Sequence, residues 1–332
     1  MGNEICNICS LKEGEPLQEE VCLSQASIKH ENSKPADTST NRSSLLPLAE
    51  TRHSSLSWNI STVKTLSFKE EALWHFMGEL QNGKRQGKGK ILFPDGGYYE
   101  GEFKNDNYHG KGTLLVKDYK YIGEFEDGKK KGKGKIEYFN PKKIYEGSFI
   151  DDVQCGYGKE LSEDGTYYEG FFTNGEKDNK GKLILPNGNV YTGEFNDDVI
   201  EGSGEFKWSA LKYYKGEWRD NCIDGFGVFT EDDKEYIGYF TKNVKNGIGA
   251  NYYIDNYIFM VAQWKDDNLC DGLSLVIDKD NKESIVLIRN NKIAKKFSDD
   301  EIYLQKITES DEYNTLKKFY NEKILSGYYC NL

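Results

Sequence analysis

Aromatic and polar residues alternate with a period of two along most of the chain, and this alternation recurs about every 23 residues. Between Tyr99 and Phe103, the two aromatic residues and Gly101 fall on one side of an extended chain, whereas the intervening glutamates fall on the other. A second alternating segment follows through Gly110 and Gly112. Each repeat is therefore predicted to form a half-buried β-hairpin.

Eight repeats follow one another in register. Each has a leading aromatic residue, a glycine two places later and a large apolar residue four places later, and a Gly-x-Gly pair follows farther on in every repeat but the fifth, where Asn179 replaces the first glycine. The leading residues are Phe76, Tyr99, Tyr121, Tyr145, Tyr168, Tyr191, Tyr214 and Tyr236. Glycine inside a strand is normally unfavourable, so its recurrence needs a steric reason. We predict that the missing side chains leave slots for neighbouring aromatic rings.

The pattern Tyr-x-Gly-x-aromatic followed by Gly-x-Gly resembles the MORN (membrane occupation and recognition nexus) repeat. This resemblance implies a mainly β fold, an elongated, open, single-layer antiparallel sheet of about eight stacked hairpins that serves assembly and carries no catalysis. A turn glycine is present in three repeats, as in Gly83, but Asp or Asn replaces it in others, as in Asp106 and Asn221. Because Asp and Asn tolerate left-handed conformations, the turns are expected to be retained.

The chain divides into five predicted segments. Residues 1–60 are expected to form a disordered leader, 61–75 a short helical cap, 76–256 the array of eight repeats, 257–292 a degenerate repeat and terminal strand, and 293–332 C-terminal helices. The apolar stripe of these helices is expected to fold onto the open end of the sheet as a cap. The alternative is a docking helix for a partner.

An aromatic ridge shared by the stacked hairpins is the predicted partner-binding surface. Its members are the leading and second aromatic residues of successive repeats: Tyr99, Phe103, Tyr121, Phe125, Tyr145, Phe149, Tyr168, Phe172, Tyr191, Phe195, Tyr214 and Trp218. We expect an uncovered part of this ridge to recruit protein partners.

Composition narrows the classes of function. The net charge of −11 would repel a phosphate backbone, which argues against nucleic acid as a partner. No apolar run is long enough to span a bilayer. The seven cysteines are scattered and no secretory signal is visible, so the chain is expected to stay in a reducing compartment and not to be secreted. The histidines lack metal-ligand spacing, and nucleotide, calcium and nucleophile motifs are missing. No metal, cofactor or enzymatic activity is predicted.

The N-terminus carries a candidate lipidation signal. Removal of Met1 exposes Gly2, and Cys6 and Cys9 follow closely, a pattern similar to N-myristoylation combined with S-palmitoylation. Cys6 stands where Ser or Thr is usual. One myristoyl chain anchors only marginally, and the following residues are acidic, so acylation of the cysteines is the predicted second anchor. The alternatives are an unmodified tail and a zinc or redox pair.

Lysines cluster in the third repeat, at Lys129, Lys130, Lys131, Lys133 and Lys135. They are candidates for contact with anionic lipid headgroups. The competing interpretation is that they form the solvated face of a strand, where lysines protect against aggregation.

Together these observations predict a non-enzymatic scaffold on the cytosolic face of a membrane that binds proteins through its sheet. A structural component of a ciliary or cortical cytoskeletal assembly is the first alternative, and a regulatory partner of a phosphoinositide kinase is the second. The open sheet has edges that could pair end to end, which leaves a homodimer open.

Overall fold

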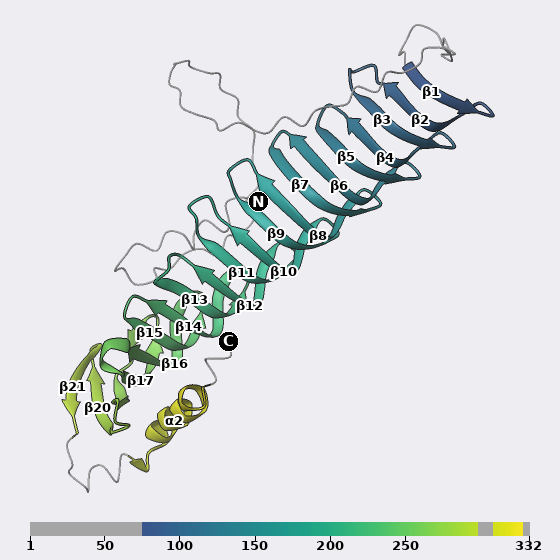
Figure 1. Cartoon of the computed structure of the whole chain (residues 1–332). Coiled ribbons are helices and arrows are strands. Elements are labelled where there is room, and N and C mark those ends of the chain that lie inside the picture. Colours follow the sequence, from purple (N-terminus) through teal and green to yellow (C-terminus); the bar gives the residue numbers. More distant parts are fainter. Residues whose placement is uncertain (1–74, 298–307, 328–332) are drawn as a thin grey trace, which may run out of the picture.

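The computed structural model describes residues 75–297 and 308–327, where the chain forms one long, open antiparallel sheet (Figure 1). Each strand pairs with its successor, except that β17 pairs with both β18 and β19. The strands are β1 His75–Gln81, β2 Lys84–Leu92, β3 Tyr98–Lys104, β4 Asn107–Leu115, β5 Tyr119–Glu126, β6 Lys129–Phe139, β7 Lys142–Ile150, β8 Val153–Ser162, β9 Tyr167–Thr173, β10 Glu176–Ile184, β11 Val190–Asn196, β12 Val199–Lys207, β13 Lys212–Arg219, β14 Cys222–Glu231, β15 Lys234–Thr241, β16 Val244–Tyr253, β17 Ile258–Lys265, β18 Asn268–Leu269, β19 Gly272–Ile277, β20 Glu283–Arg289 and β21 Lys292–Lys296.

Helical structure is short. Within residues 75–297 and 308–327, its elements are a 3-10 turn η3 Ile254–Asn256, the α-helix α2 Asp311–Phe319 and a π-helical extension η4 Tyr320–Leu325. At a strand spacing of about 4.8 Å, the stacked strands extend over about 90 Å. The prediction of a mainly β, elongated, open, single-layer sheet is therefore confirmed.

Each repeat tyrosine lies over the two glycines of its own hairpin. Tyr99 is fully buried, and a Cβ atom added to Gly101 or Gly112 would lie within 2.6 Å of its hydroxyl oxygen. That hydroxyl donates a hydrogen bond of 2.8 Å to the carbonyl oxygen of Glu102. The predicted slots are confirmed, because the ring occupies the space that two side chains would otherwise fill.

Two residues with positive φ make each hairpin tip. In the β3–β4 turn these are Asn105 (φ 49°) and Asp106 (φ 73°), and turns of this type match the right-handed twist of paired strands. The prediction that Asp and Asn replace the turn glycine without loss of the turn is confirmed, because all five replacements have positive φ: Asp106, Asp152, Asp198, Asn221 and Asn243.

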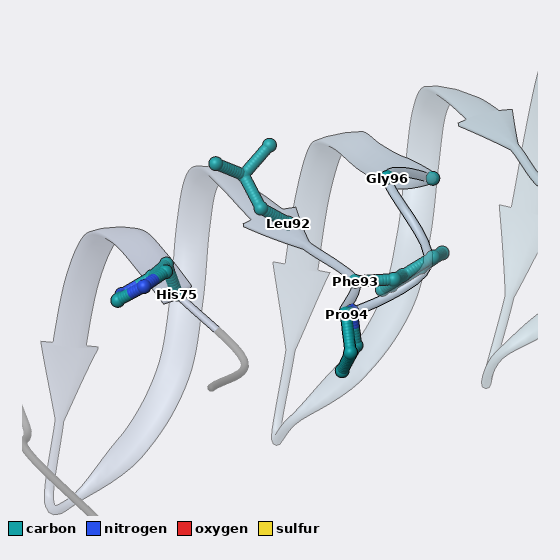
Figure 2. A pocket seen from close by; sticks show the side chains of 6 residues that line it. His75, Leu92, Phe93, Pro94 and Gly96 are labelled. Carbon is teal, nitrogen blue, oxygen red and sulfur yellow. The ribbon is translucent and has the colours of Figure 1, made fainter. Parts of the chain in front are cut away.

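The first glycine of a Gly-x-Gly pair lies at a β-bulge. The β3–β4 register shifts after Gly101, and Gly110 on β4 has φ 57°. The carboxylate of Glu102 lies against Gly110, and its Oε1 accepts a hydrogen bond of 3.4 Å from the Lys111 amide. Bulges bend a strand, and the strands are visibly curved in Figures 1 and 2.

A second apolar cluster lies on the opposite face of the sheet near its C-terminal end. It joins sheet residues Phe226, Val228, Ile237, Ala250, Val261, Leu275 and Ile277 to helical residues Leu316, Phe319, Tyr320 and Ile324. The helix α2 begins after Ser310, whose hydroxyl accepts a hydrogen bond from the Tyr313 amide. The helix therefore covers a face of the sheet. The prediction that it caps the open end is wrong.

The last strand, β21, occupies part of the segment that was predicted to be helical from residue 293. A turn at Asn290 and Asn291, both with positive φ, reverses the chain so that Lys292–Lys296 pairs with β20. β21 is exposed and rich in lysine, which protects a sheet edge from further pairing. The predicted leader, the predicted helical cap apart from His75, and residues 298–307 and 328–332 of the predicted C-terminal helices lie outside the described residues.

Candidate binding surfaces

The predicted ridge residues lie together in a continuous core. Each of the twelve is at most 4% exposed. Their rings form an edge-to-face chain along the array: Tyr99 lies 5.1 Å from Phe103 of its own repeat and 5.2 Å from Phe125 of the next. The structure thus corrects the prediction of a free partner-binding ridge. Because the strands curve, the rings of two residues four places apart in one strand touch. Each ring is then covered by its neighbours along the ridge.

Burial also fixes the chemistry of the ridge tyrosines. Loss of hydration raises the pKa of the Tyr99, Tyr121 and Tyr214 hydroxyls well above the ordinary value. These hydroxyls therefore stay protonated and serve as donors to backbone carbonyl groups, as Tyr121 does to Glu124.

The second turn residue of many hairpins bonds to the preceding hairpin, an arrangement that we call a turn clasp. Asp106 Oδ1 accepts from the Arg85 amide at 2.9 Å and from Arg85 Nε at 3.1 Å. These hydrogen bonds, led by that from the amide, lower the pKa of the Asp106 carboxyl. The other clasp pairs are Asp152 with Lys130, Asp198 with Lys177, Asn221 with Ile200, Asn243 with Ile223, Asp267 with Lys245 and Asn291 with Leu269.

The lysine cluster divides between the two faces of the sheet. Lys130 is buried on the aromatic face, where its Nζ lies 3.1 Å from Asp152 Oδ1, so its assignment to a lipid-facing patch is wrong. Lys129, Lys131, Lys133 and Lys135 are exposed. Contact of these four with lipid headgroups stays a prediction.

On the outer face, the face opposite the ridge, lysine and glutamate alternate across neighbouring strands. One row joins the residue at the middle of each Gly-x-Gly position to the residue three places after the next repeat tyrosine. It contains the pairs Lys88 with Glu102, Lys111 with Glu124, Lys133 with Ser148, Lys180 with Glu194 and Ser203 with Glu217. Opposite charges in register stabilise adjacent strands and keep this face hydrated. The outer face therefore has no uniform basic character over these repeats.

The row is interrupted in the fourth and fifth repeats by an exposed apolar group, the outer patch. It consists of Tyr157 and Phe171, each 45% exposed, with Ile150 at 57% and Val153 at 42%. A shallow hollow of about 940 Å³, lined in part by Glu124, Lys131 and Cys155, lies beside it. This patch was not among the surfaces predicted from the sequence. The available signal was the replacement of a Lys and Glu pair by two aromatic residues at equivalent positions.

A second, smaller hollow of about 490 Å³ lies at the start of the sheet (Figure 2). His75 of β1 and Leu92 of β2 are paired there, and Phe93, Pro94 and Gly96 form the following turn. Its lining contains one imidazole and otherwise apolar or glycine residues, which offers little for acid–base or nucleophilic chemistry.

Comparison with known families decides the classification. A family model described as MORN repeat matches seven segments, residues 76–98, 99–116, 121–140, 145–167, 168–190, 191–210 and 214–230. The chain belongs to the MORN-repeat family. The same hairpin geometry continues in an eighth unit, β15 and β16, where Tyr236 covers Gly238 and Gly249. MORN repeats form protein-binding scaffolds, and the family is generally non-enzymatic.

One solved structure similar to this MORN-repeat chain is the TCP domain of SAS-4 (dCPAP) of Drosophila melanogaster, in complex with a proline-rich motif of Ana2 (dSTIL). The match has 11% identity and a TM-score of 0.24, and it covers 68% of this chain and 99% of that chain. A TM-score this low supports no conclusion about fold or function.

The predicted lipidation residues Gly2, Cys6 and Cys9 lie outside the described residues of this MORN-repeat protein. Among the residues that are described, no helix is long and apolar enough to cross a membrane. Residues 75–297 and 308–327 likewise contain no group of three or more His, Cys, Asp or Glu residues that could hold a metal ion.

Proposed function

We propose that this MORN-repeat protein is a non-enzymatic scaffold that holds protein partners at the cytosolic face of a membrane. In this proposal fatty acyl chains on Gly2, Cys6 and Cys9 provide the tether. The N-terminal Met-Gly sequence with nearby cysteines supports acylation. Glu13, Glu15 and other acidic residues follow, so two or more acyl chains, and not a basic segment, would provide stable anchoring.

The observation that carries the scaffold role is the continuous sheet of stacked hairpins. Its backbone hydrogen bonds, ring contacts and turn clasps join each hairpin to the next, as between β4 and β5 or β6 and β7. Such an array holds surface features at fixed separations over tens of ångströms, which suits the positioning of several partners.

The anchor is tested by replacing Gly2 with Ala in the full chain expressed in its native cell. We expect the wild-type protein to fractionate with membranes and to show added acyl mass, and the Gly2→Ala variant to move to the soluble fraction. Cys6→Ser with Cys9→Ser should reduce membrane binding, whereas Cys22→Ser serves as the matched control. Unchanged membrane binding of Gly2→Ala, or an unmodified intact mass of wild type, would refute the anchor.

A structural role in a ciliary or cortical cytoskeletal assembly is the second candidate, because an extended rigid array suits a load-bearing or spacing element. Detergent extraction separates the two proposals. A membrane-tethered scaffold enters the detergent-soluble fraction, whereas a component of a cytoskeletal assembly stays in the pellet.

A further inference from the structure

Two aromatic pairs lie at equivalent places on the outer face of the sheet. Tyr157 pairs with Phe171 across β8 and β9, and Phe226 pairs with Tyr239 across β14 and β15. Both pairs form edge-to-face contacts, with ring centroids 5.7 Å and 5.3 Å apart. The first member of each follows a bulge glycine, and the second stands three places after a repeat tyrosine. The backbone thus presents the same ring pair twice, three repeats apart.

The C-terminal helix covers Phe226 of the second pair and contacts Tyr239, which stays 38% exposed. The ring centroid of Phe319 lies 6.4 Å from both Phe226 and Tyr239. Lys323, one helical turn later, places Nζ 4.9 Å from the Phe226 ring centroid. Phe226 is only 3% exposed as a result. The molecule itself therefore shows which ligand this ring pair accepts: an amphipathic helix with a phenylalanine and, four residues on, a lysine.

The first pair has no such cover among the described residues. Tyr157 and Phe171 are each 45% exposed, and the exposed Ile150 and Val153 pair with each other at the adjoining hairpin tip. Aromatic rings of this size bury a large apolar area when a partner covers them, and such clustered anchors dominate binding energy at protein interfaces. The equivalent pairs on either side are polar, Lys133 with Ser148 and Lys180 with Glu194, so the patch is a local exception.

We infer that the outer patch binds a short amphipathic helix of a partner protein, with an aromatic residue of the helix packed on Tyr157 and Phe171 as Phe319 packs on the second pair. This inference rests on the proposed scaffold function and specifies the kind of partner and the place where it binds.

The surroundings of the patch define the charge of that helix. Beside Phe226 and Tyr239 the adjacent cross-strand pair is Val228 with Ile237, whereas beside the outer patch it is Lys159 with Glu169. Glu169 accepts hydrogen bonds from Tyr157 and Tyr167 and forms an ion pair of 3.2 Å with Lys159. A partner helix therefore needs polar side chains toward Glu169 and aliphatic side chains toward Ile150 and Val153. A lysine one turn after its aromatic residue would face the Glu169 carboxylate as well as the Tyr157 ring.

The test uses a fluorescent synthetic peptide of residues 310–327 as the probe and the purified full chain as the receptor. The tethered helix of the same molecule has an effective concentration in the millimolar range, so micromolar peptide leaves the second pair covered. We expect saturable binding to wild type, measured by fluorescence polarisation. The same peptide with Phe319→Ala should bind roughly tenfold or more weakly.

The receptor variant Tyr157→Lys with Phe171→Glu installs the pair that the next repeat carries as Lys180 with Glu194, so the sheet is expected to fold. Its affinity for the peptide should fall roughly tenfold or more, whereas Leu211→Lys, which removes an apolar side chain 61% exposed elsewhere, should bind like wild type. Absence of saturable binding to wild type, or equal binding to the double variant, overturns the inference.

Self-association is the competing outcome. Sedimentation velocity that shows a concentration-dependent dimer of wild type, lost in the double variant, would mean that a second copy of the chain occupies the patch, and would overturn the partner-helix assignment. The double variant retains Gly2, Cys6 and Cys9, so its membrane fractionation reports on the proposed tether independently of the patch.

Discussion

The sheet has two regions that share one backbone and differ on one face. In the first region, through about β13, the aromatic face forms the apolar core, and the outer face, apart from the outer patch, carries charged pairs such as Lys135 with Glu146. In the second region, from β14 onward, the outer face carries Val228, Ile237 and Ala250, and the C-terminal helix covers them. The side chains on the outer face therefore decide whether the sheet remains a single layer or is covered by a second layer, the C-terminal helix.

Ile122 and Ile237 illustrate this difference, because each directly follows a repeat tyrosine. Ile122 is 50% exposed and lies between Thr113 and Lys135, whereas Ile237 is fully buried between Val228 and Ala250. Residue type and repeat position are the same for both. Burial is set by the neighbours across the strands and by the helix that they recruit.

The largest expected effect comes from truncating these two isoleucines. Ile237→Ala should lower the free energy of unfolding by about 2 to 5 kcal/mol, because it leaves a cavity between the sheet and the helix. Ile122→Ala, the matched control, should change it by less than about 0.5 kcal/mol. Urea unfolding of both variants provides the measurement. Equal losses would contradict the division of the sheet into two regions.

An intermediate effect is expected at the glycine slots. Gly101→Ala should destabilise the protein by about 1 to 3 kcal/mol, because its Cβ would lie 2.6 Å from both the Tyr99 hydroxyl and the Gly112 Cα. In the degenerate ninth unit of the second region, Met260 stands in place of the tyrosine and Ala262 in place of the glycine. Because this unit has no tyrosine ring over the glycine position, the methyl group of Ala262 fits there.

Ala262→Gly is the matched reversal. It should lower the free energy of unfolding by about 1 kcal/mol, because it removes a packed methyl group and gives the unfolded backbone more freedom. Thermal unfolding monitored by circular dichroism measures both variants. A Gly101→Ala variant as stable as wild type would show that the ring does not need the slot.

The smallest expected effect concerns the turn clasps, which are acidic at Asp106 in the first region and neutral at Asn221 and Asn243 near the start of the second. The pKa of Asp106 is lowered in the folded chain, so its stabilisation is present above the ordinary aspartate pKa of about 3.9 and is lost as pH falls through the lower folded value. Asp106→Asn keeps the acceptor oxygen and removes the titration.

We therefore expect wild type to lose more stability than Asp106→Asn between pH 6 and pH 3. The difference should be small, because the Asp106 side chain is 43% exposed and solvent screens its charge. Urea midpoints of both proteins at the two pH values test this. Parallel pH profiles would mean that the clasp acts through geometry and not through its charge.

Much of the fold could be predicted from local pattern. The alternation around Tyr99, Gly101 and Phe103 identifies a strand with one apolar face, and the Asp and Asn residues at hairpin tips identify the turns. β21 was missed because the Asn290 and Asn291 turn was overlooked. The segment after it was assigned from its helical signals alone.

The candidate binding surfaces could be predicted only in part. The ridge residues were found, but their burial was not, because exposure depends on how far the strands curve and on the rings of the next repeat. Tyr157 and Phe171 were overlooked because they are 14 residues apart in sequence and become neighbours only through the register of β8 with β9.

The sequence by itself determined the hairpin repeat, the tyrosine over its glycines and the turn residues, because these depend on side chains within one or two adjacent strands. Only the tertiary structure decided which side chains remain exposed, where the C-terminal helix packs and which turn residues clasp the preceding hairpin. Those properties depend on strand curvature, on register and on contacts between residues distant in sequence, and a one-dimensional pattern does not contain them.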